Sequence, residues 1–222
     1  YKYISSDKIF EGNDHYIRLS GNSDSDSDLP NLLLDKISLN SKRLDSFFYI
    51  KQGVVSGCDK VTKASLDIYK NDNKNNIQLN DGIFVFDLCN PRDVAVINSF
   101  NEKEKKFLKN FYKNSNIKKY TTDQNPTKKL LYIEWDFKID EYENIKKHLV
   151  KFSKILKGRL SVKEKRHKWY VLSWARKESI FNLDKILVPY RSTQNIFGYN
   201  NIEWFCRSDC YVIFKKTEDI EI

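Results

Sequence analysis

The order of apolar and polar positions along the chain predicts mostly short strands. Weak alternation over residues 1–19 around Gly12, Asn13 and Asp14 is typical of a short hairpin. Further short apolar or alternating runs predict strands at 47–50, 83–88, 130–135, 169–174, 185–189 and 211–214. The strand at 169–174 would place Trp174 in the core. None of these runs approaches the length that a membrane-spanning helix needs.

The clearest helical pattern covers residues 141–157. Its apolar positions, spaced by three or four, are Tyr142, Ile145, Leu149, Phe152 and Leu156. Gly158 follows at the position where helices commonly end. Lysines occupy the opposite face, so the segment predicts an amphipathic helix with a basic surface.

Two shorter helices are predicted, over 29–39 and after Asn101. The first has leucines and an isoleucine at helical spacing behind Pro30. In the second, Asn101 and Glu104 form a capping-box pattern. The apolar side expected for that second helix consists of Phe107, Leu108 and Phe111.

Strands dominate early in the chain, and strands mixed with helices follow. This order predicts an α+β fold with two subdomains. We expect a strand-rich N-terminal part over 1–100 and a basic α+β part over 101–222, both within one recognition domain. Residues 20–28 form a polar, acidic tract of low complexity, which predicts a mobile loop.

The composition fits a folded protein of 222 residues, with 40% hydrophobic and 14% aromatic side chains. No charged segment followed by an apolar one opens the chain, so nothing marks it for secretion. The four cysteines lack the spacing of a disulfide framework, which favours reduced thiols and a cytoplasmic location. The sequence starts at Tyr1 and has no Met, which indicates a piece of a longer protein.

Charge is concentrated in the second half of the chain. Residues 1–100 have a net charge of −2 and residues 101–222 a net charge of +11. The segment 146–168 alone carries ten Lys and Arg side chains and one acid, Glu164. Such a basic stretch is typical of a polyanion site, although a solvated surface in a lysine-rich chain has the same composition.

Patterns for catalysis and metal binding are weak. Asn90-Pro91 and Asn125-Pro126 lack the second proline and the aromatic residue that an adenine methyltransferase motif requires. Asp93 with Glu104 and Lys106 fits a nuclease pattern on paper, but Glu104 also fits the capping box. Cys206 and Cys210 are not accompanied by histidines at zinc-ligand spacing. We therefore expect no catalysis, cofactor or metal site in this chain.

Two groups of side chains are candidates for binding nucleic acid. Basic side chains would hold phosphates as point charges or forks, and polar side chains on turns would reach base edges. The phosphate-binding candidates are Lys147, Lys151, Lys154, Arg159, Lys163, Lys165 and Lys168. The base-reading candidates are Gln52, Ser56, Lys60, Arg166, Trp169, Arg191, Ser192, Gln194 and Asn195.

Five segments together resemble a known family. They are "FFYIKQGVVSGCDKV" (47–61), "LLYIEWD" (130–136), "NIKKHLVKFSKILKGR" (144–159), "KWYVLSWAR" (168–176) and "KILVPYRSTQNIFGYN" (185–200). Their order and spacing are similar to those of the TaqI-like C-terminal specificity domain. The resemblance spans roughly residues 45–215.

The resemblance implies a target recognition domain that binds double-stranded DNA mainly through the major groove. The parent would be an adenine-specific DNA methyltransferase of a type II restriction-modification system. Its catalytic domain, which is absent here, would be covalently linked and would bind S-adenosylmethionine. Two alternatives stay open: a module that binds single strands or RNA through Tyr and Trp stacking, and a protein-interaction, hydrolase or nuclease domain.

Overall fold

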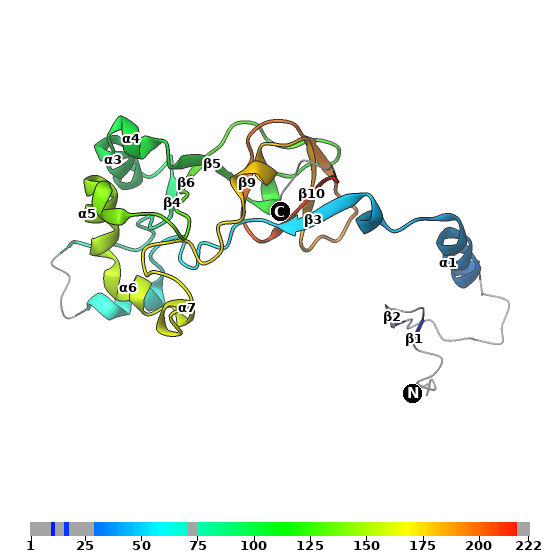
Figure 1. Cartoon of the computed structure of the whole chain (residues 1–222), viewed down its shortest axis with the longest axis horizontal. Coiled ribbons are helices and arrows are strands. Elements are labelled where there is room, and N and C mark those ends of the chain that lie inside the picture. Colours follow the sequence, from blue (N-terminus) through cyan, green and yellow to red (C-terminus); the bar gives the residue numbers. More distant parts are fainter. Residues whose placement is uncertain (1–9, 12–15, 18–28, 71–74, 217–222) are drawn as a thin grey trace. The chain divides into compact units, whose positions relative to one another are not determined.

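The computed structural model describes residues 10–11, 16–17, 29–70 and 75–216. The chain divides into two compact units, Tyr1–Phe47 and Phe48–Ile222 (Figure 1). All residues of the principal hydrophobic core belong to the second unit. The candidate binding side chains also lie there.

The first unit contains a hairpin and a helix. Strands β1 (Phe10–Glu11) and β2 (Tyr16–Ile17) pair antiparallel, which confirms the predicted hairpin. Helix α1 (Leu29–Asn40) confirms the first short helix and is followed by the 3₁₀ turn η2 (Leu44–Ser46). The predicted mobile loop at 20–28 lies outside the described residues.

An antiparallel sheet of four strands joins the beginning and the end of the second unit. Its order is β3 (Phe48–Gln52), β10 (Cys210–Lys215), β7 (Lys185–Pro189) and β8 (Gly198–Asn200). Ile213 lies opposite Ile50 on one side and opposite Ile186 on the other. The predicted strands at 47–50, 185–189 and 211–214 are thereby confirmed.

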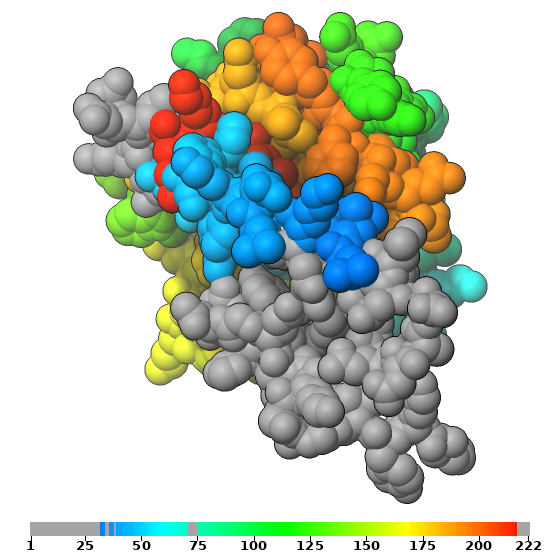
Figure 2. Space-filling model, turned by 90° about the vertical axis from the view of Figure 1, so that its right-hand side faces the viewer, coloured from blue at the N-terminus to red at the C-terminus, as the bar shows by residue number. Residues whose placement is uncertain are grey.

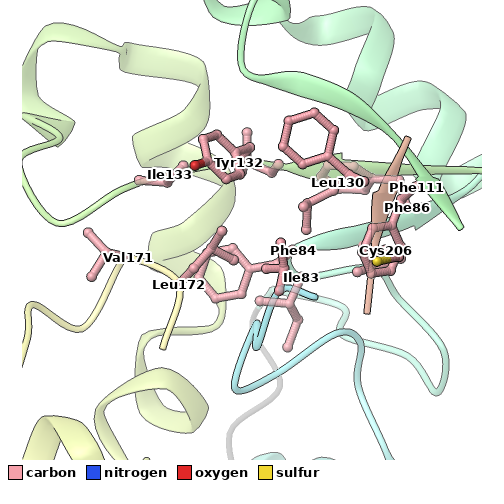
Figure 3. Close-up of a cluster of buried hydrophobic side chains, with 14 of the residues drawn as sticks. Ile83, Phe84, Phe86, Phe111, Leu130, Tyr132, Ile133, Val171, Leu172 and Cys206 are labelled. Carbon is pink, nitrogen blue, oxygen red and sulfur yellow. The ribbon is translucent and has the colours of Figure 1, made fainter. Parts of the chain in front are cut away.

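A second sheet of four strands contributes Phe86, Phe111, Tyr112 and Phe205 to the buried core. Its order is β4 (Val85–Asp87), β6 (Lys128–Leu131), β5 (Leu108–Tyr112) and β9 (Phe205–Cys206). The pairing of β5 with β9 is parallel, and the other pairings are antiparallel. Figure 3 shows the buried cluster, in which Val171 and Leu172 lie near Tyr132, Ile133 and Phe84, and Phe86, Phe111 and Cys206 lie together at its other side.

Short helices and turns connect the strands, and Figure 1 shows α3, α4 and α5 at the same end of the unit as β4 and β6. The helices and turns are α2 (Lys63–Leu66), η3 (Asp67–Tyr69), α3 (Pro91–Ser99), α4 (Glu102–Lys105), η4 (Asn114–Asn116), η5 (Ile139–Glu141), α5 (Glu143–Lys151), α6 (Ser153–Lys157), α7 (Leu160–Lys163) and η6 (Glu178–Phe181). Together with the two sheets they confirm the α+β class.

The predicted helix at 141–157 is real but divided. Its backbone leaves helical geometry at Phe152 (φ −101°, ψ 12°), between α5 and α6. The apolar positions are buried as predicted, since Ile145, Leu149 and Leu156 have no exposed surface. Gly158 ends α6 with φ −71°, in ordinary helical geometry.

Glu104 caps two helices at once, which accounts for its complete burial. Its carboxylate accepts hydrogen bonds from the Asn101 N–H at 3.0 Å, completing the predicted capping box of α4. It also accepts from the Asn144 N–H at 2.8 Å and the Ile145 N–H at 3.3 Å, in the first turn of α5. These hydrogen bonds, together with the Asn144 side-chain amide, outweigh the effect of burial and lower the pKa of Glu104.

Two predictions of local structure are wrong. Leu108 and Phe111 lie in β5 and not in a helix, because α4 ends at Lys105 and the following residues pair with β6. Residues 169–174 form no strand beyond one bridge between Trp174 and Val55. Trp174 is 61% exposed, so its predicted burial is also wrong.

The predicted division near residue 100 does not coincide with a boundary between the sheets. The first sheet pairs β3 with β10, and the second pairs β4 with β6. Each sheet therefore combines strands from both sides of residue 100. Hydrogen bonding between distant segments decides this arrangement, and such pairing has no local signal in the sequence.

Candidate nucleic-acid interface

The turn that follows β3, residues 53–60, is held between two other segments. Val54 forms a parallel bridge with Arg207, and its N–H donates to the Cys206 carbonyl at 2.7 Å. Val55 forms an antiparallel bridge with Trp174, with N–H to oxygen distances of 2.9 and 2.8 Å. Bridges on both sides fix the turn, although it lies outside both sheets.

The two glycines of this turn are required for different reasons. Gly57 has φ +76°, a left-handed conformation that glycine adopts without steric cost. Gly53 has no positive φ but lies close to another backbone: a Cβ there would be 2.3 Å from the Cys206 carbonyl oxygen. The spacing of the glycines therefore reflects one special conformation and one close approach.

Arg159 ties the turn to two other segments of the chain. Its Nε donates to the Leu156 carbonyl at 3.2 Å, and Nη1 donates to the Ser56 carbonyl at 3.1 Å and the Ser173 hydroxyl at 3.3 Å. Its Nη2 donates to two more carbonyl oxygens, of Trp169 at 2.7 Å and Val171 at 2.9 Å.

All five N–H donors of Arg159 are therefore used inside the protein. Burial lowers the pKa of its guanidinium to about 10, so the side chain stays charged at neutral pH. The prediction that Arg159 binds phosphate is wrong, because a phosphate would have to displace these hydrogen bonds. Its role here is structural.

A cavity of about 880 Å³ opens beside the turn and is lined by residues from 54–60, 78–93 and 207–208, together with Thr62, Lys113 and Lys128. Its basic residues are Lys60, Arg92, Lys113, Lys128 and Arg207. Most of its acids are already paired: Asp81 with Arg92 at 2.7 Å, Asp59 with Arg207 at 3.6 Å, and Asp87 with Lys128. The cavity wall is thus a network of ion pairs.

Burial shifts the pKa of two further groups in the cavity wall. Burial raises the pKa of Asp93, although its carboxylate accepts from the Gly82 N–H at 2.9 Å and the Asp87 N–H at 2.7 Å. Burial also raises the pKa of the Cys58 thiol to about 11, which keeps it protonated at neutral pH. Cys58 is therefore a poor nucleophile.

The base-reading candidates of this turn have different surroundings. Ser56 is buried and its hydroxyl donates to Asp59, so it is not available on the surface. Gln52 is half-buried in β3 opposite Tyr211. Lys60 is exposed and donates to the Asn80 side chain at 2.7 Å. Of the three, Lys60 is the side chain most accessible to a ligand.

The predicted basic stretch lies on α5, α6, α7 and the loop after them. The exposed candidates are Lys147, Lys151, Lys154, Lys163, Lys165, Arg166 and Lys168. Lys147 pairs with Glu143 at 2.6 Å, and Arg166 pairs with Glu164 at 2.8 Å. Trp169 is half-buried and packs against the core, with the Lys157 ammonium 5.6 Å from its ring centre.

The loop between β7 and β8 projects into solvent, and the candidates Arg191, Ser192, Gln194 and Asn195 are all exposed. Figure 2 shows this orange hairpin at the surface beside a green segment, and the bridge between Tyr120 and Gly198 joins the two. Tyr120 is 76% exposed. The structure therefore places the polar loop next to an exposed aromatic side chain.

Sequence reasoning missed Trp174, Arg176 and Arg207. Trp174 and Arg176 flank the 53–60 turn on one side and Arg207 on the other. The run "WYVLSWAR" has apolar residues at both odd and even positions, so alternation could not tell which of them face solvent. Only the pairing with Val55 exposes Trp174.

Metal ligands are not clustered in the part of the chain that the structure describes. Within residues 29–70 and 75–216, no group of three or more His, Cys, Asp or Glu side chains could hold a metal ion. The helices among these residues are all too short or too polar to cross a bilayer.

Comparison with known proteins adds no family: no protein-family model matches this sequence, and no curated protein matches it significantly.

Proposed function

We propose that this chain is a sequence-specific double-stranded DNA recognition module. It is the target recognition domain of an adenine-specific DNA methyltransferase from a restriction-modification system. The linked catalytic domain of the parent holds S-adenosylmethionine and performs the transfer, and this part binds the duplex in the cytoplasm without catalysis. The sequence resemblance and the distribution of charged side chains support the proposal.

The observation that carries the proposal is a group of lysines without acidic partners on one set of helices. Lys151 in α5, Lys163 in α7 and Lys165 just after it are exposed, and no acid among the described residues lies within ion-pair distance of them. A polyanion can pair with these ammonium groups without displacing an acid, and its binding releases condensed counterions.

The polar loop at the end of β7 supports sequence reading. Arg191 and Gln194 are exposed on a hairpin whose strands are fixed by the first sheet. Arg and Gln side chains on a rigid element can match the donor and acceptor pattern of base edges. We infer that this loop enters a groove while the lysines hold the phosphates.

Exposed aromatic side chains favour a second candidate, a module that binds single strands. Trp135 is 78% exposed and Trp174 is 61% exposed, and an indole face can stack on an unpaired base. This candidate predicts preference for unpaired oligonucleotides. Competition between single-stranded and duplex oligonucleotides of the same sequence separates the two functions.

The test is a fluorescence titration of labelled duplex DNA at several salt concentrations. We expect affinity to fall steeply with salt. The triple variant Lys151→Ala, Lys163→Ala, Lys165→Ala should bind duplex DNA more weakly. The loss of affinity should be the same for cognate and random duplexes. Its slope of log affinity against log salt should be smaller by about 0.9 for each phosphate that the altered side chains no longer neutralise.

A matched control changes three exposed lysines that already have acidic partners. Lys70, Lys105 and Lys138 pair with Asp67, Glu102 and Glu141, respectively. Their replacement by Ala removes the same charge and should leave the salt slope nearly unchanged. Equal effects of both triple variants would mean that net charge alone matters, and a flat salt response of the unaltered chain would overturn the proposal.

A further inference from the structure

Trp174 and Arg176 form a cation–π pair beside the 53–60 turn, in which Trp174 is exposed and Arg176 is half-buried. The Arg176 guanidinium carbon lies 4.2 Å from the centre of the Trp174 ring. This distance is shorter than that of any other cation–π contact among the described residues. Because Trp174 is 61% exposed, the contact occurs at the surface and not in the core.

The backbone holds both members of the pair in place. The Trp174 N–H and carbonyl are both bonded to Val55 across the bridge. Arg176 has φ +65°, a left-handed conformation that is costly for a residue with a Cβ. Its carbonyl accepts a hydrogen bond from the Tyr132 hydroxyl, which stabilises that conformation. The fold therefore fixes the backbone from which the Arg176 side chain extends, and the Trp174 ring lies against its guanidinium.

The guanidinium of Arg176 has N–H donors that make no hydrogen bond within the described part of the chain. Its Nε points to the Gly53 carbonyl at a long 3.5 Å, and its two terminal nitrogens have no hydrogen-bond partner within the described part of the chain. Arg159 uses all its donors internally, and Arg166 is paired with Glu164. Arg176 is thus an oriented arginine fork with free N–H groups.

We propose that Arg176 is a specificity-determining residue that donates from its guanidinium fork to the O6 and N7 acceptors of a guanine in the major groove, and that Trp174 is a positioning residue that holds the fork in plane. This inference rests on the proposed duplex recognition. It adds Arg176 to the base-reading side chains, which the sequence did not suggest.

Guanine explains the arrangement better than a phosphate does. A phosphate accepts from many directions, so a mobile lysine is sufficient to hold it. The two acceptors of guanine lie in one plane at a fixed separation and require a planar fork in matching orientation. Contact with an indole ring holds the guanidinium in one orientation. A guanidinium that rotated freely would not keep that orientation.

The experiment uses selection of binders from a random duplex library by the unaltered chain, by Arg176→Lys and by Trp174→Leu. Lysine keeps the charge but has neither fork nor stacking plane. We expect the unaltered chain to prefer one G·C pair that Arg176→Lys no longer distinguishes, a loss of about tenfold or more in preference at that position. Affinity for random duplexes should change by less than about threefold, since the charge is kept.

Replacing that guanine by 7-deazaguanine removes the N7 acceptor and provides an independent measurement. The modified base should weaken binding by the unaltered chain and have no further effect on Arg176→Lys. Trp174→Leu should lose part of the same preference and no other. Unfolding midpoints of the variants, measured by urea denaturation, confirm that they are folded.

The outcomes separate two kinds of failure. If the unaltered chain selects no duplex sequence, the proposed function fails and the role of Arg176 fails with it. If it selects a sequence and Arg176→Lys keeps the same preference, or if Arg176→Lys weakens all duplexes equally, only the guanine contact is overturned. The unaltered chain could instead prefer unpaired strands and lose that preference in Trp174→Leu. That result would show that Trp174 stacks on bases, and it would overturn the guanine contact.

Discussion

Single residues in the second unit act mainly through hydrogen bonds that join distant segments. Arg159 is the clearest example, because its guanidinium connects α6 with the 53–60 turn and with residues 169–173. A basic residue in a basic stretch has the composition of a surface contact. Its actual role follows from the carbonyl groups that surround it, which come from separate parts of the chain.

Arg159→Lys should therefore destabilise the protein strongly while conserving its charge. One ammonium cannot reach all the acceptors, and each buried carbonyl left without a donor costs about 1–3 kcal/mol. We expect a loss of about 2–4 kcal/mol in the free energy of unfolding, measured by urea denaturation. Arg166→Lys is the matched control and should change it by less than about 0.5 kcal/mol. Equal midpoints would contradict the structural role.

His148 makes stability depend on pH. It is buried among Phe86, Phe100 and Phe152, and its Nε2 lies 2.9 Å from the Ile83 carbonyl. Burial lowers its pKa from 6.5 to about 4. The unfolded chain therefore takes up a proton as pH falls below 6.5, whereas the folded chain stays neutral until about pH 4.

Stability from this group is fully present above pH 6.5 and is lost progressively between pH 6.5 and 4, by about 3 kcal/mol. His148→Gln keeps a donor for the Ile83 carbonyl and removes the titration. We expect the variant to be less stable than the unaltered chain at pH 7.5, and the difference to shrink at pH 4.5. Parallel losses in both chains during urea unfolding would disprove the assignment.

Among the elements, the 53–60 turn depends most on exact backbone geometry. Gly57→Ala would impose a left-handed φ on alanine and put its Cβ 2.1 Å from the Ser173 hydroxyl oxygen. We expect a loss of more than about 2 kcal/mol in thermal or urea unfolding. Gly158→Ala is the matched control, since Gly158 has helical φ and its nearest contact is at 3.2 Å. That change should remain within about 1 kcal/mol.

Elements with their own periodic pattern were predictable. The helix around Leu149 could be predicted because its apolar residues repeat at helical spacing over several turns. Phe152 only divides this helix into two. The segment around Leu108 could not be predicted, because its apolar residues fit a helix as well as a strand. Its pairing with β6 makes it a strand. Tertiary context overrides local preference where the local signal is short.

At the scale of the whole molecule, the strand pairings determine which fragments of the chain can fold on their own. The first sheet needs both β3 and β10, and the second needs both β4 and β6. We expect residues 48–222 alone to unfold cooperatively with nearly the same midpoint as the full chain. A fragment of residues 101–222 should stay unfolded by circular dichroism, because it lacks one strand of each sheet. Cooperative folding of that shorter fragment would contradict the topology.

By itself the sequence determined the α+β class, the basic character of α5 to α7 and the capping box at Asn101. These depend on composition, periodicity or residues near one another in the chain. Only the tertiary structure decided that Arg159 is internal, that Ser56 is buried, and that the Arg176 guanidinium lies over the exposed ring of Trp174. Each of those outcomes depends on contacts between segments far apart in sequence, whose register no local pattern specifies.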